Sequence, residues 1–407
     1  MTDKIADEVP WTPNSAAKCE LIFGLVGPTG VDLTRVCDAL TNQLKAVGYE
    51  TRIITLSKLI LPFVGRNPSF SSEFERIETL MTEGTTLRRE TGQADIVARL
   101  GLAEIRAIRK SITGNASEPA PNGVAYIVRS FKRPEEAQLF RDVYGKAFNL
   151  ISVYAPRDTR RKNLASKLQG IQHNGSGPEE LAVRLIARDF TEDGRLGQQV
   201  SGAFPLADFF VTSGSLSQIE SSLRRLVRLT FGDPYISPSR DEQGMFFAQA
   251  AALRSLDLSR QVGAAITTVD GDIIATGCNE VPKFGGGLYW EGDEGTARDV
   301  ELGFDANARI KLELVADAFQ RLQKRNWLIP EIQNMPAEQL ARESIEGNLA
   351  FFRDSRIFDV IEFGRAVHAE MAAISQAARQ GSSLQGARLY CTTFQIGRAS
   401  CRERVCT

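Results

Sequence analysis

Residues 21–34 read LIFGLVGPTGVDLT, and this stretch decides the fold of the first half of the chain. A short apolar run enters a Gly-Pro-Thr-Gly turn, and apolar residues then recur at helical spacing as far as Leu44. A second strand is expected at residues 51–56. A glycine-rich turn between a strand and a helix is a place where backbone amides can hold a phosphate group.

More buried strands are expected farther along the chain, at residues 125–128, 150–154 and 207–211. Helical segments separate them, and this alternation is typical of a parallel sheet with helices on both faces. The sequence therefore predicts an α/β domain over residues 21–230, which follows a polar tail at residues 1–20.

The glycine-rich turn departs from the common phosphate-loop pattern, which would have Gly and Lys at positions 32 and 33. This chain has Asp32 and Leu33 there. The domain resembles a P-loop nucleotide kinase without its lysine, and the arginines at 157–161 stand where such kinases carry lid arginines. The resemblance implies nucleotide binding more than phosphoryl transfer, and a tight structural turn remains the alternative. The candidate nucleotide-binding residues are Gly27, Gly30 and Thr34.

The pattern changes in the second half, after a polar joint at residues 233–240. A helix is expected at 241–257, followed by strands at 262–268 and 273–277 around an Asp-Gly turn. A long insertion at 280–365 precedes a helix that begins at His368 and a strand at 389–394. We expect a second domain over residues 231–394.

The second domain carries a His-x-Glu motif, His368-Ala369-Glu370. In zinc deaminases such a His ligates the metal, the Glu carries protons, and a later Pro-Cys-x-x-Cys supplies two thiolates. The alternative is a structural histidine at a helix start whose ring makes only hydrogen bonds within the protein. The small residues after Glu370 and the strand that follows favour the deaminase interpretation. The two cysteine positions hold Ile396 and Ala399.

Three segments resemble the deoxycytidylate deaminase family, at residues 254–266, 276–282 and 363–374. Together with the first domain, they resemble bacterial anti-phage deoxycytidylate (dCTP/dCMP) deaminases. The resemblance implies a cytidine-deaminase-like α/β/α domain, a Zn²⁺ cofactor with His368 as one ligand, Glu370 as the catalytic residue, and contact of Asn279 with the nucleotide sugar. A local turn is the alternative for Asn279.

The segment after Phe394 departs from this family. Residues 395–405 look like the translation of a sequencing adapter, so we expect a deaminase domain that is incomplete at its C-terminus and a non-native tail at 395–407. A catalytic zinc needs three protein ligands, and Cys401 and Cys406 have the wrong spacing to replace the missing pair. We therefore expect this chain to lack bound Zn²⁺ and to be inactive.

The expected activity of the family is hydrolytic deamination of deoxycytidine nucleotides, dCTP or dCMP to dUTP or dUMP, in anti-phage defence by nucleotide depletion. The first domain would then bind a regulatory nucleotide or RNA. Two alternatives stay open: a nucleotide kinase, and a nucleotide-sensing interaction protein with a dead deaminase domain.

Composition sets the remaining expectations. The 407 residues are 43% hydrophobic and 24% charged, with a formal net charge of -1, which argues against a binding surface for long nucleic acid. No apolar run reaches the ~18 residues of a membrane span, and the six scattered cysteines suit reduced thiols. We expect a cytoplasmic protein without membrane contact that forms a homo-oligomer.

Overall fold

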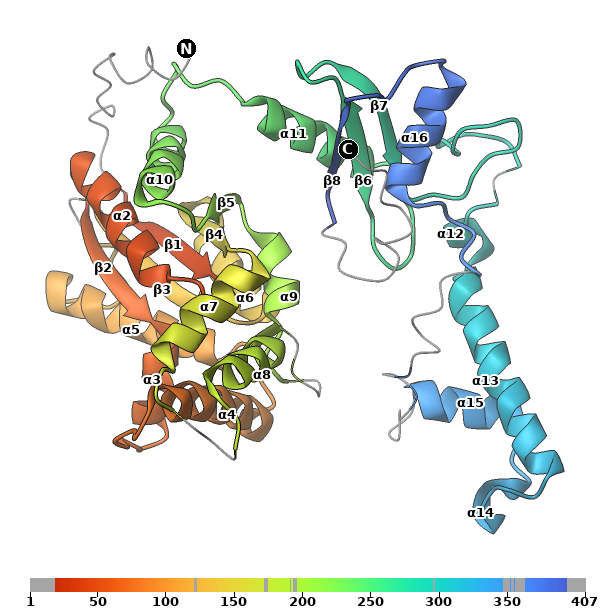
Figure 1. Cartoon of the computed structure of the whole chain (residues 1–407), viewed down its shortest axis with the longest axis horizontal. Coiled ribbons are helices and arrows are strands. Elements are labelled where there is room, and N and C mark those ends of the chain that lie inside the picture. The colour runs from red at the N-terminus through yellow and green to blue at the C-terminus, as the bar shows by residue number, and fades with distance from the viewer. Residues whose placement is uncertain are drawn as a thin grey trace. The chain divides into compact units, whose positions relative to one another are not determined.

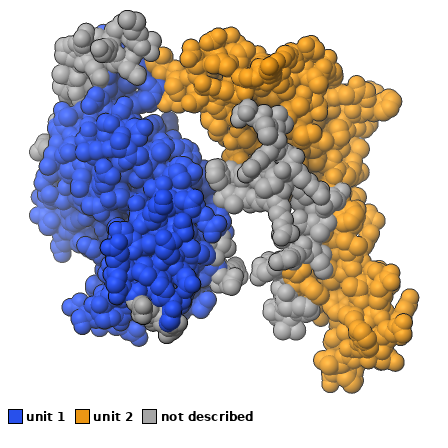
Figure 2. All heavy atoms as spheres, in the orientation of Figure 1, with its two compact units in different colours: residues 1–236 blue, residues 237–407 orange. Residues whose placement is uncertain are grey.

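A computed structural model describes residues 19–120, 123–171, 175–190, 192, 196–295, 297–346, 352, 355 and 363–393. The chain divides into two compact units, residues 1–236 and 237–407 (Figure 2). The division falls within the polar joint at residues 233–240. Most of the expected N-terminal tail and all of the tail at 395–407 lie outside the described residues.

The first unit is built on a sheet of five parallel strands in the order β2-β3-β1-β4-β5 (Figure 1). The strands are β1 (Leu21–Val26), β2 (Glu50–Thr55), β3 (Val124–Phe131), β4 (Phe148–Tyr154) and β5 (Phe209–Thr212). The predicted parallel sheet is therefore confirmed. The sequence patterns found all five strands, because four of them contain a short apolar run between helical segments and β2 is rich in β-branched residues.

Helices cover both faces of this sheet, as predicted, because alternate residues of β1 point to opposite sides. Phe23 and Leu25 pack in one core with helices α2 (Leu33–Ala46) and α10 (Leu216–Thr230). Ile22 and Val26 pack in a second core, to which α3 (Leu56–Phe63), α5 (Ile96–Thr113) and α6 (Pro134–Tyr144) contribute.

A third cluster of helices belongs to the first unit. It joins α4 (Glu73–Thr91), α7 (Arg157–Lys167) and α8 (Pro178–Phe190) around a small core that includes Phe74, Leu164 and Leu185. The remaining elements are short: α9 (Val200–Ala203) and the 3₁₀ turns Gly145–Ala147 and Phe204–Leu206. Helices α4 and α7 also line the pocket that is described below.

The second unit contains a three-stranded antiparallel sheet in the order β7-β6-β8. Its strands are β6 (Gly263–Thr267), β7 (Ile273–Cys278) and β8 (Arg388–Cys391). Helices α11 (Arg240–Ala252) and α16 (Ala369–Arg379) pack on it. A Cβ on Gly263 would lie 2.0 Å from the Ala248 carbonyl oxygen of α11. A Cβ on Gly277 would lie 2.4 Å from the Ala369 carbonyl oxygen of α16.

Those two glycines face opposite sides of the sheet, because Ala264, not Gly263, is paired with Gly277. The second unit is thus layered as helix, sheet and helix, the α/β/α arrangement predicted from the sequence. The insertion contributes α12 (Asp299–Leu302), α13 (Ala306–Lys324), α14 (Pro330–Gln333) and α15 (Ala337–Glu346), and α13 and α15 share a small core around Phe319 and Leu340. Within the described part of the chain, no helix is long and apolar enough to cross a membrane.

Candidate functional sites

The His-x-Glu motif lies at the start of α16. His368 is the N-cap residue in extended conformation, and Glu370 is in the first turn. The Val367 amide donates a hydrogen bond to the Glu280 carbonyl oxygen at 3.1 Å, which ties the approach to this helix to the segment that follows β7. Because α16 rests directly on Gly277, the sheet fixes the depth at which Glu370 sits, and this residue is only 8% exposed.

The carboxylate of Glu370 lies beside the thiol of Cys391 at the end of β8. Burial raises the pKa of Cys391 to about 12, and a hydrogen bond to Glu370 together with its charge adds to the effect. Cys391 is therefore a neutral thiol at physiological pH. The contact brings β8 next to the His-x-Glu motif.

Asn279 directly follows β7, next to Glu280, and its side chain makes three hydrogen bonds within the second unit. Its Oδ1 accepts hydrogen bonds from the Val262 amide at 2.6 Å and from Ser255 Oγ at 2.9 Å. Its Nδ2 donates to the Arg260 carbonyl oxygen at 2.7 Å. These bonds fold the segment between α11 and β6. Nδ2 has a second N–H, for which no partner is seen among the described residues, and contact of Asn279 with a nucleotide sugar stays a prediction.

The described residues do not form a zinc site. Among them, no group of three or more His, Cys, Asp and Glu side chains is placed to hold a metal ion. A catalytic zinc uses three protein ligands, and His368 is the only predicted ligand within the described ranges. The positions of Ile396 and Ala399 lie outside the described residues.

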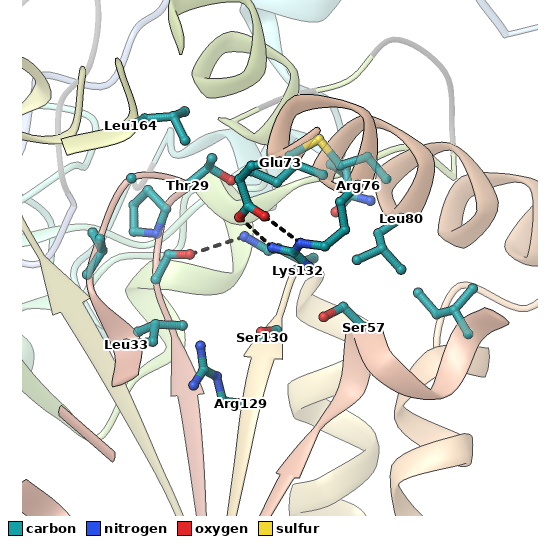
Figure 3. A pocket seen from close by; sticks show the side chains of 18 of the residues that line it. Thr29, Leu33, Ser57, Glu73, Arg76, Leu80, Arg129, Ser130, Lys132 and Leu164 are labelled. Atoms are coloured by element: carbon teal, nitrogen blue, oxygen red, sulfur yellow. Dashed lines mark hydrogen bonds and ion pairs between the residues drawn. The ribbon is translucent and has the colours of Figure 1, made fainter. Parts of the chain in front are cut away.

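The second candidate site is the glycine-rich loop between β1 and α2. It lines a pocket of about 210 Å³ together with residues of α3, α4 and the end of β3. Figure 3 shows Arg76, Arg129 and Lys132 on the walls of this pocket. The site lies at the carboxyl ends of parallel strands, where ligands bind in α/β sheets.

The loop amides that could face a phosphate are bonded to carboxylates of the protein. The Thr29 amide donates to Asp189 Oδ2 at 2.6 Å. The amides of Thr34 and Arg35, in the first turn of α2, donate to Asp32 Oδ1 at 3.1 and 3.3 Å. Asp32 therefore caps the helix that it begins. The sequence pattern placed Asp32 at this turn but gave no sign of Asp189.

Lys132 is a cation at this loop that the sequence analysis missed. Its Nζ donates to Asp189 Oδ1 at 2.7 Å and to the Gly27 carbonyl oxygen at 3.2 Å. A bulge directs it there: Ser130 has a φ of 77°, and the register of β3 against β1 shifts at this point. The basic residues Lys132 and Arg133, which follow the apolar run at 125–128, were the feature of the sequence that could have indicated a cation at this sheet edge.

Gly30 has a structural role that the sequence did not reveal. Its φ is +94°, and a Cβ would lie 2.5 Å from the Arg160 carbonyl oxygen of α7. At Gly27 a Cβ would meet only the flexible Leu33 side chain, at 2.7 Å. Substitution of Gly30 therefore disturbs the packing of α7 on the loop as well as any ligand contact.

The arginines at the start of α7 are mostly engaged within the first unit. Arg161 pairs with Glu179 at 2.6 Å. Arg160 donates from Nε to the Ala155 carbonyl oxygen, and burial lowers its pKa. Arg157 is exposed. A role of these arginines as phosphate clamps stays a prediction.

Known structures align with about half of the chain at low identity. A shikimate kinase from Bacteroides thetaiotaomicron is 16% identical with a TM-score of 0.31, and covers 51% of this chain and 97% of its own. A shikimate kinase from Acinetobacter baumannii in complex with shikimate is 10% identical with a TM-score of 0.31, and covers 54% and 96%. A gluconokinase from Sinorhizobium meliloti is 9% identical with a TM-score of 0.26, and covers 53% and 97%.

A search of the curated proteins finds no match. One family model matches the chain within the second unit, and the matched residues include the strands β6, β7 and β8 and the motif on α16. Residues 238–395 match the family model of the cytidine and deoxycytidylate deaminase zinc-binding region.

Proposed function

We propose that the second unit is built for hydrolytic deamination of deoxycytidine nucleotides, dCTP or dCMP to dUTP or dUMP. The observation that carries the proposal is the match of residues 238–395 to the deaminase family, with Glu370 buried at the start of α16. The biological role that we propose is depletion of a DNA precursor during phage infection.

Glu370 is the group to which we assign proton transfer. Water adds at C4 of the cytosine ring, the ring N3 gains a proton, and ammonia leaves after the amino group is protonated. A carboxylate at one position can accept the proton of water and deliver protons to N3 and to the amine. General acid–base groups of this kind typically contribute about 10²–10⁴-fold in rate.

The ligand set limits what this chain can do. Family members use Zn²⁺ to activate the water, with one histidine and two cysteines as ligands, and this chain has Ile396 and Ala399 at the cysteine positions. We propose that the chain in this form binds substrate weakly and does not turn it over. Such a chain binds nucleotides without converting them, as the alternative of a nucleotide-sensing interaction protein holds.

The kinase alternative has less support. Phosphoryl transfer in P-loop enzymes uses a loop lysine that reaches the β- and γ-phosphates, and position 33 is leucine. A measurable rate of phosphate transfer from ATP to any nucleoside monophosphate would revive it.

The test replaces residues 395–407 by the Pro-Cys-x-x-Cys motif and the C-terminal segment of a deoxycytidylate deaminase (the cysteine variant), with a matched control in which both cysteines are serines. Release of ammonia from dCMP, dCTP and cytidine is measured beside zinc content. We expect deamination only in the cysteine variant, and loss of about 10²-fold or more on adding Glu370→Gln. A cysteine variant that holds one zinc but deaminates none of the three compounds contradicts the proposal.

A further inference from the structure

We propose that the glycine-rich loop of the first unit is a phosphate-binding site that the protein's own carboxylate occupies, so that a phosphate group enters only by displacing Asp189. This inference does not depend on the deaminase activity proposed for the second unit. It concerns loop residues 27–32 and the groups that contact them.

Asp189 stands where a bound anion would stand. It is fully buried, with one oxygen 2.6 Å from the Thr29 amide nitrogen and the other 2.7 Å from Lys132 Nζ. A loop amide and a lysine ammonium at hydrogen-bond distance are the donors that P-loop proteins aim at a phosphate. The carboxylate satisfies both of these donors in this conformation.

Lys132 supplies the charge that position 33 lacks. It reaches the loop from the end of β3, because the bulge at Ser130 turns the chain toward the Gly27 carbonyl oxygen. If Asp189 withdraws, the Thr29 amide and Lys132 are both exposed to the same vacated position. A tetrahedral oxyanion then has one charged and one neutral donor already in place.

The surroundings favour a negatively charged ligand. The pocket beside the loop is lined by Arg76, Arg88, Arg129, Lys132 and Lys167, of which Arg76 is paired with Glu73 and Arg88 with Glu136. Arg129 donates to Thr34 Oγ1 at 3.1 Å, and its Nε is buried without a hydrogen-bond partner among the described residues. Asp189 occupies the Thr29 amide and Lys132, the two donors of the loop beside this pocket.

The position of Asp189 in its helix allows it to move. It is the second-last residue of α8, which ends at Phe190, so release of its carboxylate breaks its bonds to Thr29 and Lys132 and involves the last turn of the helix, not its interior. Helix ends open at a lower free energy than helix interiors. A phosphate group competes with the carboxylate for the same two donors, and phosphate carries more charge and more acceptor oxygens.

The test compares the full chain with Asp189→Asn, and uses Glu180→Gln in the first turn of the same helix as the matched control. Binding of inorganic phosphate, pyrophosphate and dCTP is measured by equilibrium dialysis. We expect affinity to rise about tenfold or more in Asp189→Asn, to stay unchanged in Glu180→Gln, and to fall again when Lys132→Met is added. Equal gains for pyrophosphate and dCTP indicate a phosphate site, and a larger gain for dCTP indicates a nucleotide site.

A folded Asp189→Asn chain with no gain for any of the three ligands overturns the proposal, as does a parent chain that binds equally well. A second measurement covers the case in which the variant does not fold. In the parent chain, saturating pyrophosphate should speed amide hydrogen exchange in the last turn of α8, because the carboxylate is released. Unchanged exchange there at saturation overturns the proposal.

Discussion

Glu136 is the buried charge on which the first unit depends most, and its removal tests the packing directly. Its side chain is 0% exposed, and its Oε1 accepts a hydrogen bond from Arg88 Nη2 at 2.8 Å, where Arg88 is itself 2% exposed. Its Oε2 accepts from the amides of Lys132 at 2.7 Å and Arg133 at 3.2 Å, where α6 begins. Glu136 thus neutralises a buried cation and also anchors the segment that carries Lys132.

Glu136→Gln keeps the size of the side chain but removes its charge, and Arg88 is left buried without a counter-ion. Breaking a buried pair in this way costs about 3–5 kcal/mol of the free energy of unfolding. The control is Glu135→Gln, because Glu135 pairs with Arg133 but its side chain is 44% exposed. Because Glu135 itself is half exposed, although Arg133 is only 5% exposed, loss of its charge should cost less than loss of the charge of Glu136. Adding Arg88→Met to Glu136→Gln should recover part of the loss, since the unpaired cation is gone.

The assay must report on the first unit alone. Native-state hydrogen exchange of peptides from β1 and β3 gives their opening free energy, which is expected to fall by about 3–5 kcal/mol in Glu136→Gln. In a Trp11→Phe background, the fluorescence of the remaining Trp290 and Trp327, which belong to the second unit, should stay unchanged. A loss in Glu136→Gln no larger than in Glu135→Gln would refute the reasoning.

Three shorter predictions follow from other residues. Ser130→Gly should stabilise the first unit slightly, because serine at a φ of 77° carries about 1 kcal/mol of strain; a lower melting temperature would contradict this. Gly277→Ala should destabilise the second unit by about 1–3 kcal/mol by lifting α16 off the sheet, and unchanged thermal unfolding would count against that close packing. Burial raises the pKa of Cys37 and Cys278 from 9.0 to about 11, so the folded state holds these two protons more tightly than the unfolded state does. The free energy of unfolding should therefore fall as pH rises from about 9 to 11. Urea unfolding curves at each pH test this, and a free energy of unfolding that rises over this range would contradict it.

Local patterns in the sequence were enough to predict the parallel sheet and the position of the His368 motif at a helix start. The strands of the first unit are short apolar runs, and such runs carry their own signal. The contact between Thr29 and Asp189 joins residues 160 positions apart, and nothing near either residue indicates it. The same holds for Lys132, which reaches the loop because of a bulge at a serine.

In the candidate deaminase site, too, the sequence identifies the residues but not their contacts. The side chain of Asn279 was identified as a functional candidate from its neighbours in the sequence, but its three hydrogen bonds inside the unit depend on how residues 255–262 fold back. The contact of Glu370 with Cys391 likewise depends on the register of β8 against β6. Sequence supplies the chemical groups, and the pairing of distant strands decides what each one touches.

Zinc content of the purified chain tests the central claim most directly. The claim is that His368 and Glu370 belong to a deaminase motif whose cysteine half is absent from this chain, so that one imidazole is left to hold the metal. We predict much less than one zinc per chain for residues 1–407, no cytosine deamination, and zinc uptake that depends on His368 once cysteines stand at 396 and 399. One tightly bound zinc per unaltered chain, lost on replacing Cys401 or Cys406, would contradict the account.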